Sequence, residues 1–370
     1  MLIGIDASRA FIKEKTGTEN YSYNLIKKLV EIDKKNKYRL YVRDSHFCEM
    51  GTAEIKHIPW PRFWTQAGLA LECLLNPPDI LFVPAHTMPI IRRPNLKVVV
   101  TIHGLEYEYL PQYYQFPQKL YLNKSTEYAV HHADHLIAVS QWTKKELVEK
   151  LRADSKKISV VYEGVRGNAV PHSEEPELSS VTSQEGLPYI LFVGTIQPRK
   201  NLIRLIKAFS RLQAQGQALC LVIAGKPGWM YDGILAAPKK CGVEKRVKFL
   251  GYVSNQDLAG LYQKALCFVL PSLCEGFGLP VLEAMRYGCP VIAAKAGALP
   301  EVVGKAGLLV DPYNVDEIAK AMKLMMENKE LREDMREKGF ARVQRFSWEK
   351  AAQETLKVFE KVVLGKTISV

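Results

Sequence analysis

Residues 271–288 have the sequence Pro-Ser-Leu-Cys-Glu-Gly-Phe-Gly-Leu-Pro-Val-Leu-Glu-Ala-Met-Arg-Tyr-Gly. The apolar run Cys267–Leu270 precedes them and is typical of a buried strand. Pro280 stands where a helix can begin and Gly288 where it can end, so the stretch predicts a strand, a glycine-rich turn and a helix. The backbone N–H groups at the start of such a helix favour an anion, which predicts a diphosphate site at the turn.

The alternation of strand and helix extends along the whole chain. Apolar runs alternate with stretches of helical periodicity such as Tyr21–Ile32 and Thr143–Leu151. Buried strands separated by helices predict parallel sheets covered on both faces, an α/β fold. The expected strands are Met1–Asp6, Tyr38–Val42, Ile80–Val83, Lys97–Ile102, His135–Val139 and Ile158–Tyr162, followed by Tyr189–Gly194, Cys220–Ala224, Val247–Leu250, Cys267–Leu270 and Pro290–Ala294.

A change of composition divides these strands into two series. Residues 168–188, NAVPHSEEPELSSVTSQEGLP, are rich in Pro, Ser and Glu and show little periodicity, which is typical of a linker. We therefore expect an N-terminal α/β domain over residues 1–170, a linker over 171–188 and a second α/β domain over 189–345. In open α/β sheets ligands lie at the carboxyl ends of the strands, so two such domains predict a cleft between them.

Residues 346–370 predict a final helix. Ser347 suits the N-cap position, and Glu349 lies in the first turn, where the helix dipole favours an anion. We expect this helix to cross back and pack towards the N-terminal domain. Its apolar face should contain Ala352, Leu356, Phe359 and Val363.

The net charge of +12 is spread over the chain. Residues 1–170 contain 24 Lys and Arg against 18 Asp and Glu, and the remainder contains 27 against 21, so each part carries +6. Dispersed positive charge suits anionic substrates or an anionic membrane surface, although any basic cytoplasmic protein would show it too. No stripe of Lys and Arg with aromatic residues marks a nucleic-acid groove, so we expect no nucleic-acid partner.

Several kinds of site lack their sequence signals. The seven cysteines form no C-x-x-C pair, and no His pair lies near them at zinc spacing, so we expect free thiols in a reducing cytoplasm. No apolar run approaches the ~20 residues of a membrane span, and Met1–Asp6 predicts a first strand and no signal peptide. No Asp-x-Asp pair is present for a metal ion, and no P-loop motif is present for a kinase or ATPase.

The string E-G-F-G-L-P-x-L-E-A of residues 275–284 resembles family 4 of the glycosyltransferases, whose signature is Glu-x7-Glu in this strand–loop–helix context. The resemblance covers essentially the whole chain and is strongest over Tyr189–Asp311. It implies a GT-B fold, in which two Rossmann-like, doubly wound domains face a central cleft. It also implies that Glu275 holds the hydroxyls of a donor sugar and Glu283 those of the ribose. The donor loop would comprise Gly276, Phe277, Gly278 and Leu279.

A second stretch, LFVGTIQPRKNL at residues 191–202, supports the resemblance. The strand ends at Gly194, and Arg199 and Lys200 stand just before the next helix. Two adjacent cations at the carboxyl end of a strand suit a pyrophosphate and the charge that develops on a leaving group. Such a pair is usually a solvated surface feature, but in this context it resembles the diphosphate clamp of the family. Val253 ends a stretch that resembles the strand end whose backbone receives the nucleotide base.

The N-terminal half carries two further resemblances. Gly17 lies in a turn similar to the family's glycine loop near the donor phosphates, where a plain strand–helix turn is the alternative. His103 follows an apolar strand and resembles the active-site histidine that touches the transferred sugar, although a lone histidine there is more often structural. Relatives often place Asp after this histidine, and this chain has Gly104, so an orienting carboxylate must come from elsewhere or be absent. The stretch Tyr162–Val165, at the end of the first domain, also resembles the family.

The resemblance implies a retaining, metal-independent hexosyltransferase without a cofactor besides its donor. We expect mannose from GDP-mannose first and a UDP-hexose second, the latter for a glucosyl- or N-acetylhexosaminyltransferase. The acceptor would be a saccharide or lipid-linked saccharide on the N-terminal domain, where the aromatic stretches Ile58–Trp64 and Leu110–Phe116 could also contact the inner face of an anionic membrane. A nucleotide-sugar epimerase would not be expected to carry the 275–284 string. A non-catalytic nucleotide-sugar-binding scaffold would not need Arg199, Lys200, Glu275, Glu283 and His103 intact.

Overall fold

The computed structural model describes residues 1–12, 15–44, 50–60, 62–113, 118–165 and 187–365. Within these residues the chain forms two α/β units, each with its own wholly parallel sheet. Unit 1 comprises Met1–Gly164 and Phe346–Val370, and unit 2 comprises Val165–Arg345. Most of the expected linker, residues 171–186, lies outside the described residues. The α/β fold with two parallel sheets is confirmed.

The seven-stranded sheet of unit 1 has the order β3-β2-β1-β4-β5-β6-β7. Its order reverses between β1 and β4, because the chain adds β2 and β3 on one side of β1 and the later strands on the other. The sequence did not predict β3, whose residues Glu-Ile-Lys-His lie on the sheet edge and form no apolar run. The strands are β1 (Leu2–Asp6), β2 (Lys37–Val42), β3 (Glu54–His57), β4 (Ile80–Val83), β5 (Lys97–Ile102), β6 (His135–Ala138) and β7 (Ile158–Val160).

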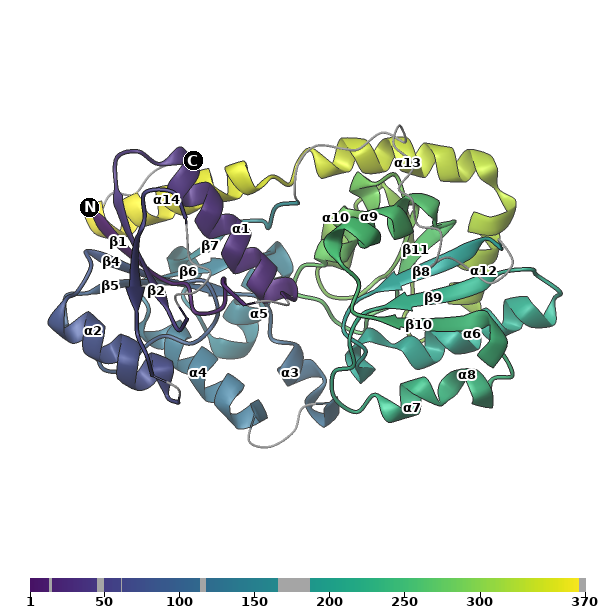
Figure 1. Cartoon of the computed structure of the whole chain (residues 1–370), viewed down its shortest axis with the longest axis horizontal. Helices are drawn as coiled ribbons and strands as arrows, with labels where there is room; N and C mark the ends of the chain where they lie inside the picture. Colours follow the sequence, from purple (N-terminus) through teal and green to yellow (C-terminus); the bar gives the residue numbers. More distant parts are fainter. Residues whose placement is uncertain (13–14, 45–49, 61, 114–117, 166–186, 366–370) are drawn as a thin grey trace. The chain divides into compact units, whose positions relative to one another are not determined.

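Helices cover both faces of this sheet (Figure 1). On one face lie α1 (Gly17–Ile32) and α14 (Trp348–Leu364). Phe82 of β4 packs against Phe359 of α14 with ring centroids 5.2 Å apart. The side chains next to Phe82 along the strand belong to the core on the other face. That core includes residues of α2 (Ala70–Leu75), α4 (Gln118–His132) and α5 (Gln141–Leu151).

The final helix α14 begins as the sequence predicts, since the Lys350 N–H donates to Ser347 Oγ over 3.1 Å. Its buried face is rotated from the expected one. Of the expected apolar face, Ala352 and Phe359 are buried, whereas Val363 is 38% exposed. Earlier positions replace it, because Trp348 and Ala351 turn towards the sheet.

The six-stranded sheet of unit 2 has the order β10-β9-β8-β11-β12-β13 and reverses between β8 and β11. Figure 1 shows α6 (Leu202–Ala214) and α8 (Ala237–Lys240) on one face, and α9 (Asn255–Lys264), α10 (Leu279–Arg286) and α13 (Lys329–Val343) on the other. The sequence did not predict β13. The strands are β8 (Tyr189–Val193), β9 (Cys220–Ala224), β10 (Val247–Gly251), β11 (Cys267–Leu270), β12 (Val291–Ala294) and β13 (Gly307–Val310).

The remaining expectations concern absences. Within the described residues, no helix is long and apolar enough to cross a membrane. The same part of the chain holds no group of three or more His, Cys, Asp or Glu side chains that could bind a metal ion. The six cysteines that the structure describes are free thiols.

Candidate functional site

Four predicted site residues of unit 2, Gly194, Arg199, Lys200 and Glu275, lie at the point where the strand order reverses. Gly194 directly follows β8, and Glu275 lies in the loop after β11, the strand next to β8 in the sheet. Ligands of open α/β sheets bind at the carboxyl ends of the two strands that flank such a reversal. The reversal therefore brings together two stretches that the sequence analysis treated separately.

Gly194 is required by the backbone at the end of β8. Its φ is +150°, and its N–H donates to Ala224 O over 2.9 Å. Gly225 of the neighbouring strand end passes so close that a Cβ there would collide with the Gly194 carbonyl group. Two glycines thus allow the ends of β8 and β9 to approach closely.

Arg199, Lys200 and Glu275 form one buried ion cluster. Arg199 Nη1 donates to Glu275 Oε2 over 2.8 Å and to Cys274 O over 2.5 Å. Lys200 Nζ donates to Glu275 Oε1 over 2.5 Å. The three side chains are only 12%, 9% and 8% exposed. The structure therefore joins the predicted clamp residues to the first glutamate of the predicted signature.

Glu275 is ionised at neutral pH. Burial alone would raise its pKa, but Arg199 and then Lys200 outweigh burial and lower it to about 2. One buried carboxylate therefore holds two cations in fixed positions at the end of the strands.

The sequence analysis missed Asn201, which fixes the turn that carries the two cations. Its φ is +62°, a left-handed conformation that Asn tolerates better than most residues. Its Nδ2 donates to Pro271 O over 3.0 Å and to Pro312 O over 2.6 Å, and its Oδ1 accepts from Arg204 Nη1 over 2.9 Å. An Asn between a strand end and a helix was the available sequence signal.

The glycine-rich loop after β11 is buried and tightly packed. Gly278 precedes α10 with a φ of +110°, and a Cβ there would lie 2.6 Å from Leu299 Cδ2. The expected N–H groups at the start of α10 are fewer than the sequence suggested, because Pro280 has none and the Val281 N–H donates to Gly278 O. Gly276 and Phe277 are buried, and Leu279, the first residue of α10, is half-buried.

Glu283 and Val253 occupy other parts of unit 2. Glu283 lies on α10, and its Oε2 accepts a hydrogen bond from the buried Tyr262 hydroxyl over 3.3 Å. Burial first and Glu283 second raise the pKa of Tyr262, so this hydroxyl stays a donor. Val253 lies in the loop between β10 and α9, after the strand at the edge of the sheet.

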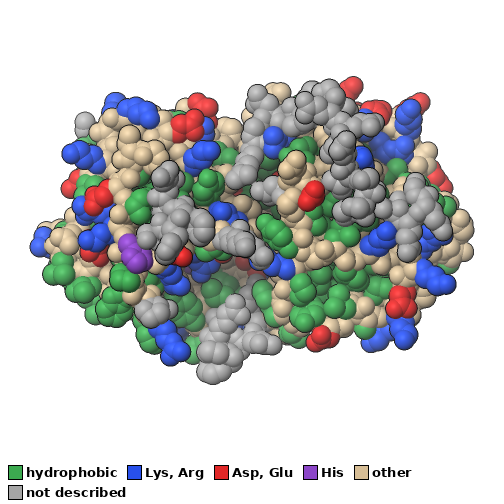
Figure 2. Space-filling model, in the orientation of Figure 1, with side chains coloured by type: hydrophobic (Ala, Val, Ile, Leu, Met, Phe, Trp, Pro, Cys, Tyr) green, Lys and Arg blue, Asp and Glu red, His purple; other side chains and the backbone are tan. Residues whose placement is uncertain are grey.

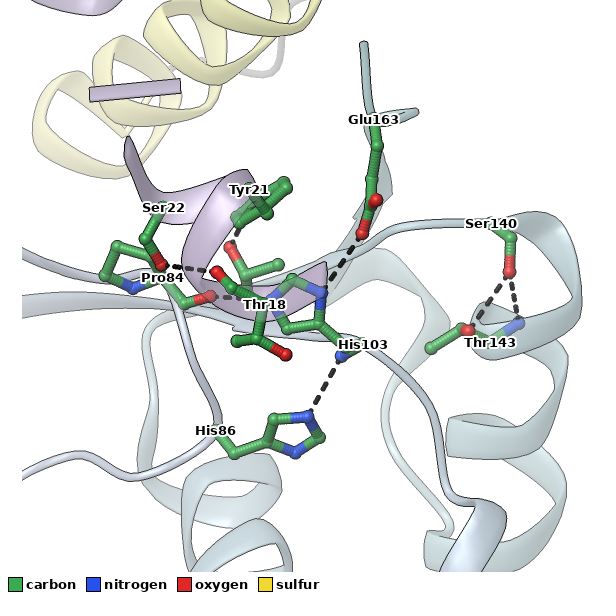
Figure 3. Close-up of polar contacts among 10 residues, drawn as sticks. Thr18, Tyr21, Ser22, Pro84, His86, His103, Ser140, Thr143 and Glu163 are labelled. Atoms are coloured by element: carbon green, nitrogen blue, oxygen red, sulfur yellow. Dashed lines mark hydrogen bonds and ion pairs between the residues drawn. The ribbon is translucent and has the colours of Figure 1, made fainter. Parts of the chain in front are cut away.

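In unit 1, His103 follows β5 and is held by two oxygen atoms (Figure 3). Its Nε2 donates to the Pro84 carbonyl over 2.8 Å, and its Nδ1 lies 3.1 Å from Glu163 Oε1. Glu163 is 60 positions further along the chain, after β7, and only 5% exposed. It supplies the orienting carboxylate that Gly104 does not. A Cβ at Gly104 would lie 2.9 Å from Glu106 Oε2, so an Asp there would crowd a second carboxylate.

Two neutral groups enclose the His103 ring. Tyr21 of α1 contacts it edge-on at 4.6 Å, and the Tyr21 hydroxyl hydrogen-bonds Thr101 Oγ1 over 3.1 Å. The His103 backbone N–H donates to His86 Nε2 over 3.2 Å. Burial, then His103 and Arg9, lower the pKa of His86 to about 3, so His86 is neutral and can accept this hydrogen bond. The sequence analysis did not identify Tyr21, His86 or Glu163 as site residues.

Gly17 is the first residue of α1. The fold does not require glycine here, because a Cβ at this position would meet no atom within 4 Å. The neighbouring Glu19 has a structural role, since its Oε2 accepts from the Thr16 N–H over 3.1 Å and caps the helix. Gly17 therefore borders open space at the carboxyl end of the sheet.

Comparisons with known proteins identify the family of the chain. Residues 16–166 match the model of "Glycosyltransferase Family 4", and residues 174–342 match that of "Glycosyl transferases group 1". The O-antigen chain mannosyltransferase B of Escherichia coli is 31% identical over 268 residues, which cover 71% of this chain and 70% of that protein. The serotype-specific mannosyltransferase WbdA of Escherichia coli is 30% identical over 252 residues, and the chain spans 31% of its length.

Solved structures share the fold at low sequence identity. Sucrose-phosphate synthase from Thermosynechococcus elongatus superposes with a TM-score of 0.83 at 19% identity, over 99% of this chain and all of the other. HepE of Anabaena, solved in complex with UDP-glucose, superposes with a TM-score of 0.76 at 18% identity, over 97% of this chain and 99% of the other.

Proposed function

We propose that this chain, which belongs to the glycosyltransferases of family 4 and group 1, transfers mannose from GDP-mannose to a saccharide or lipid-linked saccharide with retention of configuration. Both halves of the chain match glycosyltransferase models. Membership of this family makes the chain a hexosyltransferase. The donor is inferred from relatives named as mannosyltransferases. A UDP-hexose is the second candidate, because the similar HepE structure was solved with UDP-glucose.

The buried cluster of Arg199, Lys200 and Glu275 is the observation that supports this proposal most strongly. Its two cations lie at the reversal of the unit 2 sheet, where a nucleoside diphosphate would place its phosphates. Arg199 and Lys200 would bind the diphosphate and stabilise the charge that develops as it leaves. Two fixed cations can do this without a metal ion.

The proposed reaction is a front-face displacement. The bond from the sugar C1 to the diphosphate oxygen breaks while the acceptor hydroxyl attacks from the same face, and the leaving phosphate takes the hydroxyl proton. Catalysis then depends on positioning and electrostatics, without a protein nucleophile. Glu275 would exchange part of its contact with the cations for hydrogen bonds to the sugar hydroxyls, and Glu283 would bind the ribose. The loop around Gly278, and separately Val253, would contact the rest of the donor. As the resemblance implies, His103 would contact the transferred sugar and Gly17 the donor phosphates.

We also propose that an anionic membrane surface binds unit 1 near α2. Six large apolar side chains between residues 60 and 91 are 44–80% exposed, and Figure 2 shows apolar side chains gathered over α2. Arg93 Nε donates to Leu74 O, which ties the loop carrying Ile90 and Ile91 to the end of α2. This apolar surface, together with basic neighbours, suits a lipid-linked acceptor at the cytoplasmic face of a membrane. It consists of Trp60, Phe63, Leu71, Leu75, Ile90 and Ile91, flanked by Arg62, Arg92 and Arg93.

The experiment that tests the donor is thermal unfolding with GDP, UDP, ADP and their sugars, with and without EDTA. A nucleotide at about 100 times its dissociation constant should stabilise the protein by roughly 2.7 kcal/mol. A shift selective for GDP and insensitive to EDTA supports the proposal, whereas no shift with any nucleotide contradicts the donor site. Turnover of GDP-mannose, with the product anomer determined by NMR, then separates the enzyme from a non-catalytic scaffold, which would bind the donor and leave it intact.

A further inference from the structure

We propose that Glu163 keeps His103 doubly protonated, so that His103 acts as a fixed positive charge and not as a base. The observation is that both ring nitrogens of His103 face oxygen acceptors, the carbonyl of Pro84 at 2.8 Å and the carboxyl of Glu163 at 3.1 Å (Figure 3). The role of His103 in sugar transfer rests on the proposed function, whereas the protonation state of its ring does not.

The hydrogen-bonding partners leave two arrangements. A carbonyl oxygen can only accept, so Nε2 carries a proton. Without a proton between them, Nδ1 and the ionised carboxylate of Glu163 would repel each other at 3.1 Å. That proton lies either on Nδ1, which gives an imidazolium beside a carboxylate, or on Glu163, which gives a neutral ring beside a carboxylic acid. Imidazole is the stronger base of the two groups, so the proton belongs on the ring. The hydrogen bond from an imidazolium to a carboxylate is charge-assisted and therefore stronger than the one between a neutral ring and a carboxylic acid.

The other groups around the ring do not compete for this proton. Tyr21 faces it from α1, and burial raises the pKa of its hydroxyl, which keeps Tyr21 neutral. His86 faces it from the loop after β4 and is neutral as well, because its pKa is lowered to about 3. Arg9 adds positive charge near His86, and Glu106 lies beside Gly104. Among the residues that the structure describes, Glu163 is therefore the one whose carboxylate directly contacts the ring.

Glu163 itself is firmly placed. The next residue, Gly164, passes so close to the start of α14 that a Cβ there would collide with the Trp348 backbone. The Trp348 ring in turn contacts Tyr21 at 5.8 Å, and Tyr21 contacts His103. Glu163 is thus a positioning residue, and the packing of α14 on α1 fixes the carboxylate that orients the histidine.

The inference changes what His103 can do. A ring with both N–H groups engaged has no lone pair to accept the acceptor's proton. It can place positive charge at the carboxyl end of β5, where this charge would attract an anionic donor. Proton transfer to the leaving phosphate needs no such base.

The test is 15N NMR of histidine-labelled full-length protein at pH 7.5, with His103 assigned by its loss in His103→Gln. We expect both His103 ring nitrogens to be protonated in the wild type and Nε2 alone to be protonated in Glu163→Gln. The glutamine amide can still donate to Nδ1, so it mimics the carboxylic acid and keeps the hydrogen bond without the charge. A neutral His103 ring in the wild type, or a doubly protonated ring in Glu163→Gln, would overturn the proposal.

Kinetics supply the second readout. Glu163→Gln and Glu163→Ala should both lower kcat/KM for the donor by roughly 10- to 100-fold, the size typical of losing an outer partner of a site histidine. If Glu163→Gln kept its activity while Glu163→Ala lost it, Glu163 would act through its hydrogen bond alone. That result would contradict the proposal that His103 is positively charged. Thermal unfolding checks that each variant folds, and Glu54→Gln, on the sheet edge of the same unit, is the matched control. If no transfer is detected with any donor, the proposed function fails, but the NMR result still decides the state of the ring.

Discussion

Lys200 Nζ and Glu275 Oε1 lie 2.5 Å apart, although 75 positions separate the two residues in the chain. They meet because β8 and β11 are neighbours at the reversal of the unit 2 sheet. A cation held by a buried carboxylate has a fixed position before any donor binds. Catalysis by positioned charge depends on this property, since the charge needs no reorganisation during the reaction.

Replacing Lys200 should therefore affect the chemical step. We expect Lys200→Met to lower kcat by roughly 10²–10³, the cost of removing one group that stabilises developing charge. The measurement is steady-state kinetics with the donor identified by thermal unfolding. Lys207→Met, on the exposed side of α6, is the control and should keep wild-type activity. Equal rates for the two variants would remove Lys200 from the proposed clamp.

The low pKa of Glu275 predicts how stability depends on pH. The folded-state pKa of about 2 lies below the ordinary value of 4.5, because Arg199 and Lys200 outweigh burial. The stabilisation is therefore complete above about pH 4.5 and is lost as the pH falls towards 2. Its size is on the order of 3 kcal/mol. Urea unfolding between pH 7 and pH 2 measures it.

The control for this prediction is Glu275→Gln. Its free energy of unfolding should be lower than that of the wild type at pH 7, because two buried cations lose their carboxylate. It should also depend less on pH below 4.5. Parallel pH curves for the variant and the wild type would mean that Glu275 does not carry the effect.

The sequence predicted the parts of this site better than their contacts. Apolar runs predicted β8 and β11, because buried parallel strands are continuously apolar, whereas the polar edge strand β3 gave no such signal. Arg199, Lys200 and Glu275 were expected as site residues, but their ion cluster depends on strand order, which periodicity does not reveal. The same holds for Glu163 and His103, which come together only because β7 and β5 end at the same edge of the sheet.

Replacement by alanine should destabilise the protein at one glycine of the proposed donor site and not at another. At Gly278 the φ of +110° and the contact with Leu299 make Gly278→Ala strained, and we expect a loss of about 1–3 kcal/mol of stability. Gly17 begins a helix and borders open space, so Gly17→Ala should leave the free energy of unfolding within about 0.5 kcal/mol. Urea unfolding compares them.

Donor binding completes this comparison. If Gly17 lets the donor approach the start of α1, a methyl group there should raise KM for the donor while stability is unchanged. Calorimetric titration of Gly17→Ala with the nucleotide identified above measures this directly. Unchanged affinity would show that the open space at Gly17 is not part of the donor site.

The apolar surface near α2 makes a prediction about membranes. Leu71 and Leu75 lie one turn apart on α2, and Phe63 is 80% exposed. Burying such side chains in a lipid interface contributes roughly 1.5–3 kcal/mol each when burial is complete, so Phe63→Ser and Leu75→Ser should each lower vesicle binding about tenfold. Co-sedimentation with vesicles of mixed anionic and neutral lipids measures the partition coefficient. Leu324→Ser, at an exposed apolar position of α12 in unit 2, should bind like the wild type.

Binding to these vesicles should weaken in salt, because Arg62, Arg92 and Arg93 flank the surface. Equal binding of all three variants, or none by the wild type, would exclude this surface as a membrane contact and leave the acceptor to be sought in solution.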